Sequence, residues 1–372
     1  MVTSLFPPVN RGSRPPRSCR APSVRAIPWA MIRAIVARLP AVAVLLLCGA
    51  AAWSAPLERT VTELLGTTCT VRLYAGGSDA ALDAAFSRIR QIEARMTLNR
   101  DDSELARINA EAGRRPVVVS AEVREVIHEG LSYSSLGDGA FDITVEPLVT
   151  LWGIGTTKAR VPRPEEIRQA VARIGWRDVL IDDAASTVFL KRPGMGIDLG
   201  SIAKGYAANE VAKVLKGDGV TSALIDLGGN ILTLGTKPDH SPWRIGIQDP
   251  SEPRGTKLGL VEIAGGSVTT AGTYERFFDE GGKRYFHILD ARTGYPAWNG
   301  LAAVAVVAGD STTADGYDTL LFTLGLERGR RLAESTRGSI EAVFITDSNQ
   351  VYVTPGLRSR FTLTDPHITL LP

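Results

Sequence analysis

The stretch that decides the fold is DLGSIAKGYAANEVAKVLKGDGVTSALIDLGGNILTLG, residues 198–235. It predicts a helix over 201–215 and then two strands, at 222–227 and 231–235, joined by a Gly-Gly turn. Similar signals on both sides predict strands at 66–75, 178–182, 186–191, 243–248, 258–263 and 301–308, and helices at 79–96, 103–109, 164–174, 313–325 and 327–335. Because strands come in clusters with helices between them, we expect an α+β fold of layered mixed sheets and helices.

The part of the chain after residue 55 is expected to form a single domain. It shows no internal repeat or low-complexity tract, and no linker long enough to divide residues 56–366. Residues 367–372 are taken as a C-terminal tail. Cys69 is the only cysteine after residue 55, so this domain can form no internal disulfide.

Residues 1–55 have the composition of an N-terminal extension and signal peptide rather than of a folded domain. Residues 31–38 are a basic n-region and residues 40–52 an apolar h-region, which is too short for a comfortable membrane span. The Pro- and Arg-rich residues before Met31 lead to no structural element, so Met31 is interpreted as the true start. We therefore expect cleavage after Ala52 and export to the periplasm.

Anchoring of the exported protein through a lipid is the less favoured alternative. Cys48 could carry the lipid only within a lipobox, and Leu47 stands where a lipobox needs Gly, Ala or Ser. Lipoprotein anchoring is therefore disfavoured, while a looser association with the inner membrane stays open.

The charge balance argues against nucleic acid as a partner. The formal net charge is +2, but seven arginines and no acidic residue precede Glu58. Removing those seven from the 42 Lys and Arg leaves 35 basic residues against 40 acidic ones. Because binding to nucleic-acid phosphates requires a basic face, we expect no nucleic-acid partner.

The segment DLGSIAKGY, residues 198–206, is the strongest candidate binding motif. A strand is expected to end near Ile197 and a helix to begin near Ser201, which places free backbone N–H groups and Lys204 at the positive end of a helix dipole. That combination suits a phosphate or pyrophosphate, and Asp198 could accept hydrogen bonds from a ring or ribose. A capped helix with one exposed lysine explains the same residues equally well, and no P-loop pattern occurs in the chain.

A second motif, ADGYDT at residues 314–319, opens a predicted helix. Asp315 and Thr319 are four residues apart, so they share one face of that helix and both offer oxygen atoms. A carboxylate, a hydroxyl and a nearby carbonyl are suitable hard ligands for Mg²⁺. From these residues alone, a capping aspartate followed by an ordinary helical threonine is the simpler interpretation.

Three turns carry further candidate residues. His287 precedes a turn dense in charged groups, HILDARTG, and could be a general base or a structural histidine. Asp142 lies in the apolar turn GAFDIT at 139–144, and Gly-Gly in DLGGN at 226–230 would let a ligand approach the backbone. Each of these two turns alone is typical of a hairpin. No zinc-ligand spacing and no GxSxG elbow is present.

Taken together, these motifs resemble the ApbE-type FAD:protein FMN transferases. The similar segments follow the family's order: GTTCTV (66–71), MTLNRDDSELARIN (96–109), GAFDITVEPLVTLWGIG (139–155), DLGSIAKGYAANEVA (198–212), LIDLGGNI (224–231), SVTTAGTYERFF (267–278), YFHILDARTGYP (285–296) and TADGYDTLLFTLG (313–325). Because they extend over nearly the whole chain after the leader, the resemblance is specific.

The resemblance implies a single-domain, layered, T-fold-like architecture that holds FAD as substrate together with Mg²⁺. It implies Mg²⁺ ligands at Asp315, Thr319 and the backbone carbonyl of Ser201, and catalytic roles for Lys204 and for His287, which would activate the acceptor hydroxyl. The FAD contacts that it implies are Leu65, Asn99, Ala140, Phe141, Asp142, Asp198, Lys204 and Leu289.

The activity that the resemblance implies is transfer of FMN from FAD to a threonine or serine of an exported acceptor flavoprotein of a redox complex, with release of AMP. Three positions depart from the family pattern. Asn99 stands where tyrosine is common, a change that accompanies FAD hydrolysis in the family, whereas Leu65 in place of methionine and Ala291 in place of proline are tolerable changes. The alternatives are therefore a Mg²⁺-dependent FAD pyrophosphatase and a non-catalytic periplasmic FAD-binding protein.

Overall fold

A computed structural model describes residues 55–372 of the chain. The expected leader, with Met31, Cys48 and the cleavage site, lies outside the described residues. Residues Ala55–Pro372 form one compact unit. In this part of the chain, no helix combines the length and the apolar character needed to span a bilayer.

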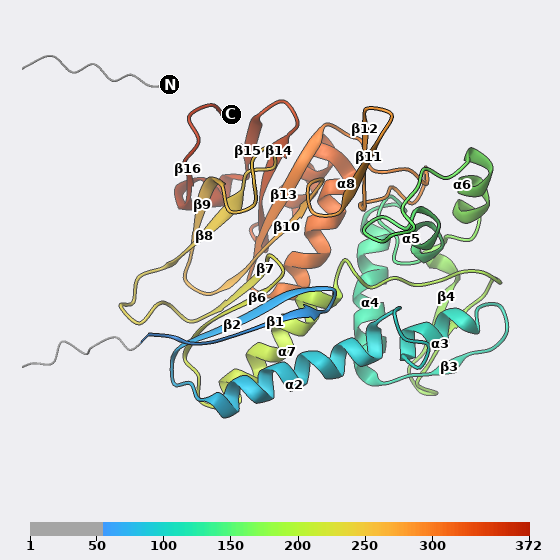
Figure 1. Ribbon diagram of the computed structural model, residues 1–372, viewed down its shortest axis with the longest axis horizontal. Helices are drawn as coiled ribbons and strands as arrows, with labels where there is room; N and C mark the ends of the chain where they lie inside the picture. The colour runs from blue at the N-terminus through green and yellow to red at the C-terminus, as the bar shows by residue number, and fades with distance from the viewer. Residues whose placement is uncertain (1–54) are drawn as a thin grey trace, which may run out of the picture. The chain divides into compact units, whose positions relative to one another are not determined.

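A nine-stranded sheet forms the middle of this unit (Figure 1). From edge to edge its strands are β1 (Leu57–Leu64), β2 (Thr67–Ala75), β6 (Ser222–Leu227), β7 (Asn230–Leu234), β10 (Gly266–Gly272), β13 (Leu301–Ala308), β14 (Ile340–Thr346), β15 (Gln350–Val353) and β17 (Thr369–Leu370). All neighbours pair antiparallel except β15 and β17, which are parallel. The residues taken as a C-terminal tail thus contribute an edge strand.

The sheet is buried on both faces, as β13 shows. Successive side chains of a strand point to opposite faces. Ala303, Ala305 and Val307 belong to the hydrophobic cluster on one face. Val304, Val306 and Ala308 belong to the cluster on the other face. A continuous run of small and β-branched apolar residues therefore fits a central strand.

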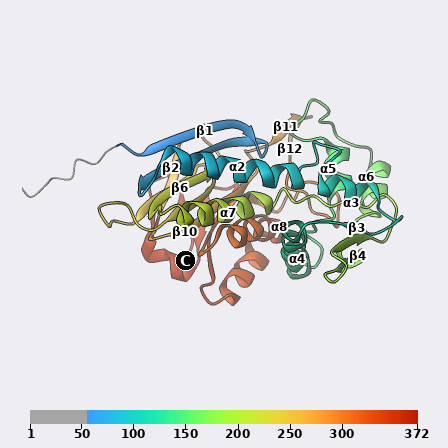
Figure 2. The same ribbon diagram turned by 90° about the horizontal axis from the view of Figure 1, so that it is seen from below.

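Three helices cover one face of the sheet: α2 (Asp79–Met96), α7 (Ala203–Gly217) and α8 (Ser311–Ser335). Figure 2 shows α2 and α7 side by side across the strands, and α7 also packs against α8. Ser78 caps α2 by accepting a hydrogen bond from the Ala81 N–H at 3.1 Å. The buried stripe of α2 holds Ala81, Leu82, Ala85, Phe86, Ile89, Ile92 and Met96.

The opposite face is covered by a smaller sheet of three strands, β8 (Trp243–Gln248), β9 (Lys257–Ile263) and β16 (Phe361–Leu363). Its apolar residues share a cluster with Val268 of β10 and Val343 of β14. The central sheet is therefore the middle of three layers, which is the layered α+β arrangement expected from the sequence.

The remaining elements lie outside these three layers. They are α3 (Glu104–Ala110), α4 (Ala121–Leu136), α5 (Glu146–Trp152), α6 (Pro164–Val171), the three-stranded sheet of β3 (Val117–Val118), β4 (Val179–Asp182) and β5 (Thr187–Leu190), the hairpin of β11 (Phe277–Glu280) and β12 (Lys283–Phe286), and 3-10 helices at Trp176–Asp178 and Pro355–Arg360. Figure 1 shows α4, α5 and α6 on the same side of the central sheet.

Several expected elements are confirmed with the same bounds, namely the helix at 79–96 and the strands at 222–227, 243–248 and 301–308. The two helices expected at 313–325 and 327–335 form one element, α8, which is interrupted where Gly325 adopts a φ of 73°. The elements that were not predicted are α5 and the strands β1, β3, β10, β11, β12, β14, β15, β16 and β17. Of these, β10 reads GSVTTAG, whose small and polar residues give little strand signal.

Candidate active site

The first turns of α7 and α8 meet around the carboxylate of Asp315. Lys204 Nζ donates to Asp315 Oδ1 at 3.0 Å, and the backbone N–H of Gly205 donates to Oδ2 at 2.8 Å. A Cβ at Gly205 would lie 2.2 Å from the carbonyl oxygen of Ser311, so only glycine permits this approach. The fold thus brings together two residues singled out in the sequence that are 111 positions apart.

Lys204 carries a positive charge at this junction. Burial by itself would lower the pKa of its amine, but Asp315 and Asp318 raise the pKa above its usual value. Lys204 Nζ also donates to the Gly200 carbonyl at 3.3 Å, which keeps the amine at the start of α7. A fixed cation at a helix N-terminus is suited to hold phosphate oxygens.

The turn before α7 leaves the backbone carbonyl of Ser201 free. The helix begins at Ala203, two residues later than the sequence analysis expected. The Gly205 N–H, which could have bonded to this carbonyl, is taken by Asp315 instead. Among residues 55–372, no donor forms a hydrogen bond with the Ser201 carbonyl oxygen. This geometry fits the ligand role that the resemblance implies for Ser201.

Asp318 is a buried acid of the site that the sequence analysis passed over. It lies one turn beyond Asp315 on α8 and is 4% exposed. Burial and the charge of Asp315 raise the pKa of Asp318, while Lys204 opposes that rise. Two buried carboxylates that share one lysine form a site with an excess of negative charge, which a cation would relieve.

Two threonine hydroxyls complete this group of oxygen atoms. Thr319 Oγ1 donates its proton to Asp318 Oδ1 at 2.9 Å, which leaves the lone pairs of the hydroxyl available. Thr269, on β10, is 1% exposed, and its hydroxyl lies close enough to Asp318 to oppose the rise in the pKa of that acid. Its Oγ1 forms no other hydrogen bond within the described residues, so it adds an oxygen atom beside Asp318.

These oxygen donors fit a hard divalent cation. Asp315 and Asp318 supply carboxylates, Thr319 a hydroxyl and Ser201 a carbonyl, which are the donor types that Mg²⁺ prefers. The described residues contain no group of three or more His, Cys, Asp or Glu side chains placed to hold a metal. A metal here would therefore be held by two carboxylates and neutral oxygens, and by substrate phosphates.

The loop at 139–144 is tied to the segment that precedes α7. The Asp198 N–H donates to the Ile143 carbonyl at 2.8 Å, and the Gly200 N–H donates to Asp198 Oδ1 at 2.7 Å. Burial raises the pKa of Asp198, and the Gly200 N–H and the charges of Arg276 and Lys204 oppose that rise. Asp198 is therefore within electrostatic reach of Lys204, as the sequence motif suggested.

The carboxylate of Asp142 is occupied by hydrogen bonds from its own loop and from Trp176. Oδ1 accepts from the Thr144 N–H at 2.8 Å and from the Thr144 hydroxyl at 2.7 Å, and Oδ2 accepts from the Trp176 N–H at 3.0 Å. Ala140 and Phe141 are buried beside it. The Ala291 N–H donates to the Ala140 carbonyl at 3.1 Å, a bond that proline at position 291 could not make. The 139–144 loop thus lies against the turn that follows His287.

His287 stands directly after β12 with a neutral ring. Its Nδ1 is buried and forms no hydrogen bond within the described residues. Burial, together with the charges of Arg276 and Lys204, lowers the pKa of His287 to about 4, against the opposing effect of the Arg276 carbonyl. A neutral imidazole with a free nitrogen can accept a proton near pH 7. Leu289, two residues on, is buried and bridges to Pro296.

Leu65 and Asn99 lie near the C-terminal end of α2. Leu65 occupies the β1–β2 turn with a φ of 54°, and its N–H donates to Glu93 Oε1 at 2.7 Å. Asn99 follows α2 in an exposed turn, where only its backbone N–H is engaged, with Thr97 Oγ1 at 3.1 Å. No hydrogen bond in the described residues joins either residue directly to Lys204 or Asp315. Their expected contacts with FAD remain predictions.

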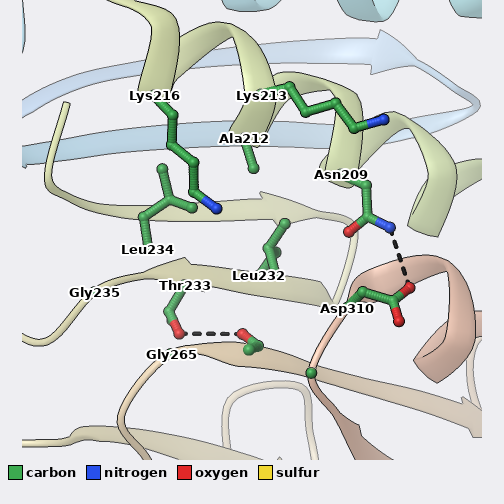
Figure 3. A pocket seen from close by; sticks show the side chains of 12 residues that line it. Asn209, Ala212, Lys213, Lys216, Leu232, Thr233, Leu234, Gly235, Gly265 and Asp310 are labelled. Carbon is green, nitrogen blue, oxygen red and sulfur yellow. Dashed lines mark hydrogen bonds between the residues drawn. The ribbon is translucent and has the colours of Figure 1, made fainter. Parts of the chain in front are cut away.

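Cavities open on the described surface both beside the expected site and away from it. One, of about 470 Å³, is lined by Gly139, Asp142, Trp176, Arg177, Arg192 and Arg292, so it adjoins the 139–142 loop. The other, of about 360 Å³, lies between the C-terminal half of α7 and strands β7 and β10. Figure 3 shows Lys213, Lys216 and Asn209 of α7 around it, with Asn209 bonded to Asp310. This second cavity contains none of the site residues expected from the sequence.

Comparisons with known proteins identify the family of the chain. The model of the ApbE family matches residues 65–344. An FAD:protein FMN transferase of Klebsiella pneumoniae is 40% identical over 302 residues, which cover 81% of this chain and 93% of that protein. An FAD:protein FMN transferase of Treponema pallidum is 36% identical and covers 82% of this chain and 89% of that protein.

Solved structures that resemble this chain belong to the same family. The ApbE protein of Thermotoga maritima superposes with a TM-score of 0.76 at 30% identity, over 82% of this chain and 99% of that one. The flavinyl transferase ApbE of Pseudomonas stutzeri gives a TM-score of 0.72 at 34% identity, over 83% and 98% of the two chains. These matches confirm the α+β prediction, and they set aside the interpretation as a non-catalytic carrier because the relatives are transferases. The chain belongs to the ApbE family and is an enzyme of flavin transfer.

Proposed function

We propose that this enzyme transfers FMN from FAD to a threonine or serine hydroxyl of an acceptor flavoprotein, with Mg²⁺, and releases AMP. The observation that carries the proposal is the Asp315 carboxylate, which is held by Lys204 and Gly205 beside Asp318 and the free Ser201 carbonyl. The names of the relatives supply the two reactants, FAD and protein. The sequence of residues 31–52 supports export to the periplasm, where the acceptor would also reside.

Each residue of the site has a task in this reaction. Lys204 and the N-terminus of α7 would bind and orient the pyrophosphate of FAD. Asp315, Asp318, Thr319 and the Ser201 carbonyl would hold Mg²⁺, which when bound neutralises charge on the phosphates and on the leaving AMP. The neutral ring of His287 would take the proton of the acceptor hydroxyl.

The proposed reaction forms one P–O bond and breaks another, and it involves no redox step. The acceptor oxygen forms a bond to the phosphorus of the FMN half, and the bond from that phosphorus to the bridging oxygen breaks. AMP leaves with the bridging oxygen, and the hydroxyl proton passes to His287. The product is a phosphoester that links FMN to the acceptor side chain.

A second candidate function is hydrolysis of FAD to FMN and AMP in the same pocket. It is favoured by Asn99, whose exposed amide can orient water but offers no ring to stack on a flavin. The two functions differ only in the nucleophile, a protein hydroxyl or water.

Incubation of the purified protein with FAD, Mg²⁺ and a candidate acceptor separates the two functions. Transfer leaves flavin fluorescence on the acceptor band after denaturing electrophoresis. Hydrolysis leaves only free FMN, which chromatography detects together with AMP. If neither product forms and no AMP appears with any acceptor tested, the proposal is wrong.

A further inference from the structure

Arg276 links three segments that border the site. It directly precedes β11, and its backbone carbonyl accepts from the His287 N–H at 3.1 Å. Its Nη2 reaches the β1–β2 turn and donates to the Gly66 carbonyl at 3.2 Å. A Cβ at Gly155 would lie 3.2 Å from the Arg276 Cδ, so the loop after α5 also contacts this side chain. Arg276 is therefore held beside His287 by contacts from distant parts of the chain.

The guanidinium of Arg276 has no acidic partner among residues 55–372. Its neighbour Glu275 is engaged by Arg254 at 2.8 Å, and Asp279 by Arg284 at 3.2 Å. Arg276 is exposed, and of its five N–H donors only the one bonded to the Gly66 carbonyl has a partner in the part of the chain that the structure describes. The remaining donors are available to a ligand.

The charge of Arg276 acts on the centre of the site. It helps to lower the pKa of His287, and it opposes the rises in the pKa of Lys204 and of Asp198. Arg276 and Lys204 are thus two cations that repel each other, and Asp315 pairs with only one of them, Lys204. Lys204 already donates to Asp315 and to the Gly200 carbonyl, so of these two side chains Arg276 has more free donors.

We propose that Arg276 is a second cationic contact for the phosphates of the flavin substrate, acting together with Lys204. This inference rests on the proposed function and adds a residue for which the sequence analysis gave no role. Arginine suits the task because its planar fork can bind two phosphate oxygens at once. An anionic ligand held by both side chains would also relieve their mutual repulsion.

The position of Arg276 also affects the pKa of His287. The charged groups that face His287 are Arg276, next to β11, and Lys204, on α7. Replacing Arg276 by a neutral residue removes one of these two charges. The pKa of His287 should then rise from about 4 towards its ordinary value of 6.5.

The test compares Arg276→Gln and Arg276→Lys with Arg284→Gln in the full protein. Arg284 lies on the same hairpin, is exposed and pairs with Asp279, so its replacement is the matched control. Affinity for FAD with Mg²⁺ is followed by flavin fluorescence, and the ring protons of His287 are titrated by NMR. The exposed residues His128, His240 and His367 provide the internal reference signals.

We expect Arg276→Gln to bind FAD about tenfold or more weakly and to titrate His287 at a higher pH. Arg276→Lys should recover part of the affinity and keep the wild-type titration, and Arg284→Gln should match the wild type in both. Unchanged FAD affinity in Arg276→Gln, beside a wild type that binds FAD and releases AMP, would overturn the inference and leave the proposed function standing.

Two further outcomes would also overturn the inference. Equal loss of affinity in the Gln and Lys variants, with a lowered unfolding midpoint in both, would show that Arg276 only joins the loops around Gly66 and Gly155. A wild type that fails to bind FAD at all would refute the proposed function and this inference with it.

Discussion

The Asp315 carboxylate lies 3.0 Å from Lys204 Nζ and thereby joins the first turn of α7 to the first turns of α8. Each oxygen of Asp315 has a donor from α7, since Gly205 supplies the second at 2.8 Å. Asp315 therefore fixes the positions of Lys204 and of the start of α7. It also supplies a negative charge that can attract a cation.

Replacing Asp315 by asparagine should abolish Mg²⁺-dependent release of AMP from FAD. The amide is similar in size and can still accept the Gly205 N–H, but it removes the charge that pairs with Lys204 and attracts the cation. We expect a decrease of about 100-fold or more in the rate, on the scale of lost electrostatic stabilisation. The measurement is AMP release, followed by chromatography at several Mg²⁺ concentrations.

Asp310→Asn is the matched control for this variant. Asp310 caps the same helix, α8, by accepting from the Thr313 N–H at 2.9 Å, and asparagine is an equally good cap. Its activity should equal that of the wild type. Wild-type activity in Asp315→Asn would show that the metal site is elsewhere.

The transfer rate should fall only in strongly acidic solution. The pKa of His287 is lowered to about 4, so the ring is neutral above that pH and becomes protonated as the pH decreases through it. A protonated ring cannot accept the hydroxyl proton. The pH profile of flavin transfer should therefore stay level from neutral pH down to the region of the His287 titration and then decline.

His287→Gln should lower the rate of transfer by about 100-fold or more while FAD affinity stays near that of the wild type. The acidic decline of the remaining activity should disappear, because the titrating group is absent. If the variant kept the same pH profile, another group would be the base.

Part of the site could be found in the sequence because its residues are close together along the chain. Asp315 and Thr319 stand four positions apart on one helix, and Asp198 and Lys204 flank one turn. Asp318 was not predicted because its importance comes from its burial, which cannot be read directly from the sequence. The pattern of acids at i and i+3 before a threonine would have been a usable signal.

Other parts depend on contacts between distant segments. Arg276 meets Gly66 across 210 positions, and this contact exists only once β1, β2 and the β11–β12 hairpin have folded. The place of β10 between β7 and β13 likewise follows from long-range pairing and not from its own composition. Local patterns therefore predicted the layers and the motif residues, while strand order and the second cation required the structure.

Asn99→Tyr should shift the products of FAD cleavage from free FMN, the product of hydrolysis, towards acceptor-bound flavin, the product of transfer. Asn99 lies exposed after α2, so a larger ring can be placed there without displacing the core. A tyrosine ring can stack on the flavin and exclude water from the phosphorus, whereas an amide can hold water. The measurement is the ratio of acceptor-bound flavin to free FMN at equal FAD consumption, with Leu98→Tyr, at a neighbouring exposed position, as the control. An unchanged ratio in Asn99→Tyr would mean that this position does not select the nucleophile.

Gly205→Ala should destabilise the fold and the site together, whereas Gly217→Ala in the same helix should not. A Cβ at Gly205 would lie 2.2 Å from the Ser311 carbonyl oxygen and 2.8 Å from the Asp315 Cβ, so α7 and α8 must move apart. The cost should be about 2–4 kcal/mol in the free energy of unfolding, which is the scale of overpacking in a rigid core. At Gly217 a Cβ meets nothing within 4 Å, and alanine should be neutral or add up to roughly 1 kcal/mol through helix propensity. Urea unfolding of the two variants measures both values, and equal stabilities would contradict the close helix contact on which the Asp315–Lys204 pair depends.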